Sequence, residues 1–317
     1  MSVSRSVRSL AWRGCMALLV LFSGGAFWGV GFFRVVDPAQ ASGDLPLYRP
    51  GRPPDEEADR KRSWPLWREP APDLEDIFLP DLQTLPPFDL QLAANRSSGE
   101  RIIRFSNSVW NSGEGVLELH GAYDDESNTV LVSQVLHGLD QDLVERSVGE
   151  FVFHREHNHW HWEGFSIYEI WTVESSGDLG ELVVTSGKVG FCMLDTSRIS
   201  DEWIKKKSIT GLEIAERRQY GQCGWRRQGI STGWVDTYDW DTPGQVMDVS
   251  NLSDGLYALL STVDPDRLLL ESDKENNTAI VFFLLREAGL LAIGEDLTGY
   301  LASLRMQELY LRFPGVR

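Results

Sequence analysis

Short apolar runs separated by small and polar residues dominate the chain between residues 76 and 290. The runs are rich in β-branched and aromatic residues, and Gly, Asn, Asp and Ser lie between them, which is typical of strands joined by turns. Helical periodicity is strong only in Ser208–Gln219 and after Asp296. The pattern predicts a mainly β, sandwich-like single domain with long loops and little helix. Strands are expected at Ile102–Ser106, Val116–Leu119, Thr129–Leu136, Phe165–Val173, Leu256–Val263 and Ala279–Leu285.

The two ends of the chain differ from this central part. Residues 1–41 contain arginines, then an apolar run of about 20 residues from Gly14 to Phe33, then Ala39-Gln-Ala41, a pattern typical of an export signal. The run is also long enough for an uncleaved membrane anchor. Residues 42–75 are rich in Pro and charge and are expected to be a linker. One folded domain at 76–290 and a helical C-terminal extension at 291–317 follow, in a protein that is exported to the periplasm, the cell envelope or the medium.

The charge of the chain limits its partners. The formal net charge is −17, and loss of residues 1–41 would remove four Arg and one Asp, leaving −20. Nucleic acid is therefore excluded as a ligand, and contact with a membrane is expected only through the N-terminal segment. An acidic surface favours the approach of cationic substrates such as a primary ammonium, although it could also serve solubility alone.

Histidines supply the strongest chemical signal, because four of the six lie between His154 and His161. In an extended strand His157, His159 and His161 share one face, and the tryptophans beside them share the other, which we expect to be buried. A flat strand would hold the first and last of the three about 13 Å apart, so one ion can bind them only if the strand is twisted or bulged. Three imidazoles without a thiolate favour Cu(II) or Zn(II). The alternative is a polar strand edge without a metal.

Three segments, in this order, resemble the lysyl oxidase family: HNHWHWEGFSIYE at 157–169, KVGFCMLDT at 188–196 and QGISTGWVDTY at 228–238. The resemblance implies an oxidoreductase that depends on copper and a quinone, and that converts primary amines to aldehydes with release of ammonia and hydrogen peroxide. The substrate would be peptidyl lysine of a protein or a small diamine. Copper would be bound by His157, His159 and His161, with His154 in a supporting role.

The same resemblance assigns the organic cofactor. Lys188 and Tyr238 would be cross-linked into lysine tyrosylquinone, which requires the lysine amine to be neutral when it attacks the oxidised ring. Asp236 lies two residues before Tyr238 and shares its face if the segment is extended, so it is the candidate general base. Cys192 and Cys223 match family cysteines that pair with each other, which implies a disulfide.

The segment from Glu271 to Asn277 presents hard oxygen ligands in a tight turn, as calcium prefers. It resembles a calcium-binding stretch of the family, which also uses an earlier Pro-Asp-Leu, here Pro80-Asp81-Leu82. The alternative is an Asx-rich hairpin turn without an ion. The ligands implied by the resemblance are Asp81, the carbonyl of Leu82, Glu271, Asp273, Asn276 and Asn277.

Two other classes of function remain open at this point. A zinc hydrolase could use the three histidines to hold a metal-bound hydroxide, but it would have no need for Lys188 and Tyr238 in their motifs. A non-catalytic, calcium-stabilised β-sandwich binding module would explain the acidic turn, but it would give the histidines no role.

Overall fold

The computed structural model describes residues 76–94, 98–139 and 143–303, which are mainly β, as the sequence pattern predicted. All of them lie in one compact unit, residues 50–317. The expected export signal or anchor at 1–41, the linker at 42–75 and the last part of the C-terminal extension lie outside the described residues. Within the described ranges, no helix combines the length and apolar character needed to cross a membrane.

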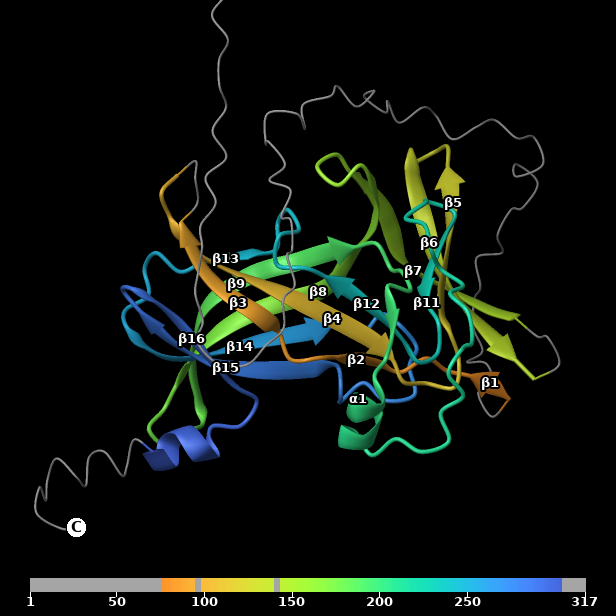
Figure 1. The fold of residues 1–317 in the computed structure, drawn as a ribbon. Helices are drawn as coiled ribbons and strands as arrows, with labels where there is room; N and C mark the ends of the chain where they lie inside the picture. Colours follow the sequence, from red (N-terminus) through yellow and green to blue (C-terminus); the bar gives the residue numbers. More distant parts are fainter. Residues whose placement is uncertain (1–75, 95–97, 140–142, 304–317) are drawn as a thin grey trace, which may run out of the picture. The chain divides into compact units, whose positions relative to one another are not determined.

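The larger of the two sheets has ten strands among the described residues, and every expected apolar run except Ile102–Ser106 falls in it. The strand order is β11-β5-β6-β7-β8-β14-β15-β16, with β1 paired to β6 and β9 paired to β8 (Figure 1). These strands are β1 (Ile77–Phe78), β5 (Leu117–Asp124), β6 (Thr129–Gly138), β7 (Leu143–His154), β8 (His159–Val173), β9 (Leu179–Phe191), β11 (Arg227–Ile230), β14 (Gly255–Val263), β15 (Thr278–Arg286) and β16 (Gly289–Gly294).

The smaller sheet has six strands in the described part of the chain and is built around the long strand β4, which contains the expected run Ile102–Ser106. Its order is β10-β12-β4-β13, and β2 and β3 also pair with β4. Its strands are β2 (Leu82–Thr84), β3 (Phe88–Ala94), β4 (Arg101–Asn111), β10 (Ser197–Arg198), β12 (Trp234–Tyr238) and β13 (Val246–Asp248).

The hydrophobic core lies between these sheets, so the architecture is a sandwich. One buried cluster contains Ile103 and Phe105 from β4 together with Tyr168 from β8, Leu259 from β14 and Phe283 from β15. The rings of Phe105 and Tyr168 meet edge to face with their centroids 4.8 Å apart. Figure 1 shows β4 lying across β8 and β14. Burial of apolar side chains from both sheets is the main force that holds the two layers together.

The prediction of a helix at Ser208–Gln219 is wrong. The helix of this region, α1 (Asp201–Lys206), comes earlier, and the chain leaves it through Ser208 with a left-handed φ of 56°. Residues 209–219 are irregular. Their apolar side chains nevertheless pack on a buried cluster around Trp110, which explains the helix-like spacing: it marks the buried side of a loop. The packed residues are Ile209, Leu212 and Ile214.

The C-terminal segment joins the sandwich before it becomes helical. Strand β16 crosses the boundary expected at residue 290 and pairs with β15. Residues 298–303 are helical, as expected after Asp296, whose side chain accepts a hydrogen bond of 2.7 Å from the Thr298 N–H. Leu297 is buried against Ala258 and Phe282, so the described part of this extension belongs to the folded domain.

Candidate metal centre and its cavity

A hairpin turn gathers the three histidines. Strands β7 and β8 are joined by residues 155–158, so His157 lies in the turn and only His159 and His161 lie in the strand. This corrects the expectation of one extended strand through all three. Asn158 supplies the sharp reversal with a left-handed φ of 56°, a conformation that Asn tolerates better than most residues. The turn removes the separation of a flat strand, and the ligand nitrogens of the three imidazoles lie within 4.8 Å of one another.

Hydrogen bonds determine which nitrogen of His157 faces the cluster. Its Nε2 lies 2.9 Å from the carbonyl oxygen of Pro243, which can only accept, so Nε2 carries the proton and Nδ1 has the lone pair. That Nδ1 lies 3.1 Å from Nε2 of His161. Nε2 of His159 is buried and has no hydrogen-bond partner among the described residues. Because buried polar atoms are normally paired, this donor set fits a bound copper or zinc ion.

The surroundings keep these imidazoles neutral, the form that binds a metal. Burial lowers the pKa of His161 to about 2 and that of His159 to about 4, and the neighbouring histidines act in the same direction. His154 stacks on the ring of His161 with centroids 4.2 Å apart, and its Nε2 is 2.8 Å from Glu163. His154 therefore packs against His161, one of the three histidines expected to bind copper, and holds its ring in place. The face of Trp162 is buried as expected, but His161 is buried as well, so both faces of β8 are covered here.

A cavity of about 400 Å³ lies beside the cluster and brings five of the expected site residues together. Strand β12 contributes Asp236 and Tyr238, which are two residues apart and therefore on one face of the strand, as expected. The β7–β8 hairpin, the segment between β9 and β10, and the loops before β11 and β13 supply the rest of the wall. Lining residues that bear on the chemistry are His157, His159, Cys223, Asp236, Tyr238 and Pro243.

Asp236 is the unusual acid of this cavity. Its side chain is 2% exposed, and neither carboxyl oxygen has a partner in good hydrogen-bond geometry among the described residues. Burial raises its pKa well above the ordinary value and the nearby carboxylate of Asp195 adds to the rise, whereas the backbone N–H groups of Leu194 and Thr237 and the charge of Arg218 oppose it. A raised pKa makes the ionised carboxylate a stronger base than an ordinary aspartate, which suits a group that takes up and releases a proton.

The two residues expected to form the quinone have different partners. The hydroxyl of Tyr238 accepts a hydrogen bond of 2.7 Å from Cys192 N–H and donates one of 2.9 Å to Cys192 O. Its ring meets Phe191 edge to face, on the core side of β9. Lys188 lies three residues earlier, on the opposite and exposed face of that strand, and its ammonium is 2.5 Å from Asp266. The structure therefore places Tyr238 at the cavity but does not bring Lys188 to it.

The expected disulfide is confirmed. Cys192 and Cys223 are joined with an S–S distance of 2.05 Å, across a sequence separation of 31 residues. Cys192 follows β9, and its backbone holds the hydroxyl of Tyr238. Cys223 lines the cavity. The bridge therefore fixes two parts of the same wall.

Asp195 is a structural residue of the site that the sequence reasoning missed. It is fully buried, and its carboxylate accepts hydrogen bonds from the N–H groups of Gln219, Tyr220 and Ser231 and from the Ser231 hydroxyl. It thus holds the irregular segment after α1 against β11. A signal was available, since Asp195 and Ser231 both lie in the motifs that resemble the lysyl oxidase family.

The acidic turn after β14 folds onto β2, as the calcium expectation requires. Glu271 accepts a 2.7 Å hydrogen bond from Leu82 N–H and a 3.1 Å bond from the Asn277 amide. Asn276 donates to Asp81 at 2.9 Å. Five of the six expected ligand residues are thus in mutual contact across about 190 residues of sequence. Asp273 is engaged otherwise, accepting at 2.8 Å from the N–H of Glu275.

Two observations indicate that this arrangement suits a cation. The side-chain oxygens of Asn276 and Asn277 are buried without a hydrogen-bond partner among the described residues. Burial raises the pKa of Glu271 to about 7, with hydrogen bonds from Asn277 and Leu82 opposing the rise. Unpaired oxygens around a carboxylate that is costly to ionise are what a bound Ca²⁺ would satisfy.

Comparison with known proteins shows what the central part of this chain is similar to. Residues 140–288 match the family model described as Lysyl oxidase. The protein-lysine 6-oxidase of Gallus gallus is 30% identical over 141 residues, which cover 44% of this chain and 29% of that protein. Lysyl oxidase homolog 4 of Homo sapiens is 30% identical over 128 residues, covering 40% of this chain and 14% of the relative. The protein-lysine 6-oxidase of Sus scrofa is 28% identical over 141 residues, or 44% of this chain and 49% of the relative. The chain thus spans less than half the length of each.

Proposed function

Residues 140–288 are lysyl oxidase-like in sequence, and on that premise we propose that this chain is a copper-dependent amine oxidase of the lysyl oxidase type. The reaction is the conversion of a primary amine, O₂ and water to an aldehyde, ammonia and hydrogen peroxide. Peptidyl lysine of a protein or a small diamine is the substrate. The protein acts after export, in the periplasm, the cell envelope or the medium.

The observation that carries the proposal is the position of the imidazole cluster at a cavity that also contains Asp236 and Tyr238. His157, His159 and His161 would hold copper, and His154 and Pro243 keep two of these rings in place. Copper and the quinone together would supply the oxidation of the amine by O₂.

Asp236 performs the proton transfer of the proposal. The two-electron oxidation of the amine removes a proton from the carbon next to nitrogen, and a base must take up that proton. Asp236 lines the cavity, is buried and has a raised pKa, so its ionised carboxylate is a stronger base than an ordinary aspartate and can remove that proton and later return it to solvent. Burial also raises the pKa of Tyr238, which keeps its phenol protonated before any oxidation.

The quinone of the proposal, lysine tyrosylquinone made from Lys188 and Tyr238, needs a conformation other than the described one. Tyr238 fits the role because it lines the cavity beside the histidines. Lys188 would have to leave Asp266 and pass to the other side of β9. It would also have to lose its proton, since an ammonium ion cannot attack the oxidised ring.

Calcium has a structural role in the proposal. Asp81, Leu82, Glu271, Asn276 and Asn277 would hold the ion between β2 and the turn before β15. Asp273 would have to turn away from the N–H of Glu275 to join them.

The test combines metal analysis with peptide mapping of the purified full chain after aerobic incubation with copper. We expect about one copper per chain, a cross-linked peptide containing Lys188 and Tyr238, and peroxide release with an amine. His159→Ala should lose the copper, whereas His137→Ala, outside the cluster, should keep it. Full copper occupancy when all three cluster histidines are Ala would refute the metal assignment. Zinc without a cross-link would favour a hydrolase, and neither metal nor cross-link a binding module.

A further inference from the structure

A positively charged loop stands out against the acidity of the chain. The net charge of the whole chain is −17, yet residues 217–227 contain four arginines and no acidic residue. This loop precedes and enters β11, and it is held in place by the buried carboxylate of Asp195 and by the Cys192–Cys223 disulfide. Its arginines are Arg217, Arg218, Arg226 and Arg227.

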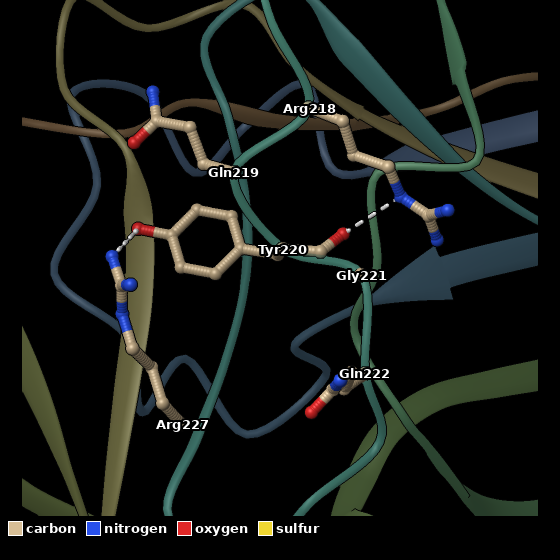
Figure 2. A pocket seen from close by; sticks show the side chains of 6 residues that line it. All are labelled: Arg218, Gln219, Tyr220, Gly221, Gln222 and Arg227. Carbon is tan, nitrogen blue, oxygen red and sulfur yellow. Dashed lines mark hydrogen bonds between the residues drawn. The ribbon is translucent and has the colours of Figure 1, made fainter.

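Two of these arginines lie at a second cavity, also of about 400 Å³ (Figure 2). Figure 2 shows Tyr220 in the middle, with Arg218 and Arg227 on either side of it. Arg218 Nε donates a 3.2 Å hydrogen bond to the carbonyl oxygen of Tyr220, and Arg227 donates one of 3.4 Å to its hydroxyl. We call this the arginine cavity, and it is lined by Arg218, Gln219, Tyr220, Gly221, Gln222 and Arg227.

The interior of the protein fixes one side of the arginine cavity. The guanidinium of Arg227 donates to the buried carboxylate of Glu118 at 2.7 Å and stacks on the ring of Tyr220 at 4.8 Å. The hydroxyl of Tyr220 donates to the same carboxylate at 2.5 Å. Because Glu118 anchors both side chains, Arg227 and Tyr220 are held in place before any ligand arrives, which lowers the entropic cost of binding.

Arg218 forms the opposite side and has donors left to use. A guanidinium has five N–H donors, and the described hydrogen bond of Arg218 uses the one on Nε. Gly221 leaves room for it, since a Cβ atom at that position would lie 3.3 Å from Arg218 Nε and 3.4 Å from its central carbon. Arg218, Gln219 and Gln222 are exposed, so a group on another molecule can reach them.

The arginine cavity and the candidate metal centre are neighbours. Gln222 lines the first and Cys223, the next residue, lines the second. Arg218 is also close enough for its charge to act on the carboxyl of Asp236. A polypeptide with a lysine in the cavity beside the histidines can therefore reach the arginine cavity with a neighbouring side chain.

We propose that the arginine cavity binds an acidic side chain of a protein substrate, and that this contact selects lysines that lie near Asp or Glu. The guanidinium fork matches a carboxylate in shape and charge, and the glutamine amides add neutral donors. The identity of the ligand as a substrate rests on the proposed function, whereas the binding of a carboxylate does not. The contact favours a lysine-bearing protein over a free diamine, which has no carboxylate.

The experiment measures binding without copper and without an amine, so it is independent of the oxidase proposal. The probe is a lysine-free peptide of alternating Glu and Gly with blocked ends, labelled for fluorescence anisotropy and titrated with the full chain. Arg218→Gln should weaken binding about tenfold or more, the usual effect of losing a charge-assisted contact. Arg217→Gln is the matched control: it removes the same charge at the adjacent position outside the cavity lining and should change binding less than about twofold.

Other outcomes overturn the proposal. Equal weakening by Arg217→Gln and Arg218→Gln would mean diffuse attraction to a positive loop, and no binding by the unaltered chain would remove the site. Glutarate or inorganic phosphate that displaces the peptide at equal concentration would identify a small anion as the ligand. Arg218→Lys keeps the charge but loses the fork, so it should bind more weakly than the unaltered chain if geometry matters. Thermal melting checks that each variant is folded.

Discussion

The sharpest prediction concerns Glu271 and the pH dependence of stability. This carboxyl is 6% exposed, and burial raises its pKa from 4.5 to about 7. Below pH 4.5 it is protonated in both the folded and the unfolded chain, so it has no effect on stability. As pH rises from 4.5 to about 7, the unfolded chain releases the proton while the folded chain keeps it, and the free energy of unfolding falls.

The size of the effect follows from the shift. At 1.36 kcal/mol per pKa unit, a rise from 4.5 to about 7 corresponds to about 3 kcal/mol of stability lost across this range in the absence of metal. A bound calcium ion requires the ionised carboxylate, so binding releases the proton. With saturating calcium the folded chain no longer holds this proton, so the loss of stability between pH 4.5 and about 7 should disappear and the curve should be nearly level there.

Urea unfolding at pH 4.5, 5.5, 6.5 and 7.5, in chelator and in calcium, measures both effects. In chelator, Glu271→Gln should lose about 3 kcal/mol less than the unaltered chain between the lowest and highest pH. Glu275→Gln is the matched control, because that side chain lies in the same turn but is 79% exposed. Parallel curves for the unaltered chain and Glu271→Gln would refute the reasoning, as would a calcium effect that survives Glu271→Gln unchanged.

Two further predictions follow from the disulfide and the charge. Reduction of Cys192–Cys223, or its replacement by two alanines, should cost about 3 to 4 kcal/mol and lower the melting temperature by roughly 10 °C, and an unchanged melting curve would contradict this. For a diamine, kcat/KM should fall as salt rises from 0.1 to 1 M, because the Debye length falls from roughly 10 to roughly 3 Å. Hydrogen peroxide release is the assay, Tyr238→Phe is the blank, and equal salt sensitivity for a monoamine would show that the acidity serves solubility alone.

The strands were predictable because their signal is local. Every apolar run that was expected to be a strand is one, and the sandwich follows from the need to bury one face of each sheet. The helix at Ser208–Gln219 was not predictable in the same way, because the spacing of apolar residues cannot tell a helix face from the buried side of a loop. Packing against Trp110 decided between them, and that contact joins residues about 100 positions apart.

The histidines were identifiable from residue type alone, whereas their geometry was not. A period of two placed His157, His159 and His161 on one strand face, but the chain reverses at Asn158. This reversal brings the three imidazoles close together, which a flat strand could do only with a twist or a bulge. Asn is common in turns because it tolerates the left-handed conformation, so a turn at Asn158 could have been found in the sequence.

The position of Lys188 in the fold could not be predicted from its motif. Its neighbours in the sequence place it on β9, and the alternation of that strand places Phe191 toward Tyr238 and Lys188 away from it. Its partner, Asp266, is 78 residues away and belongs to none of the motifs. This ion pair is half exposed on the lysine side, so it contributes at most about 1 kcal/mol. Beyond this ion pair and the loss of the lysine proton, the barrier to the cross-link comes from moving the Lys188 side chain to the other side of β9, and the arrangement of the sheets, not the motif, sets that barrier.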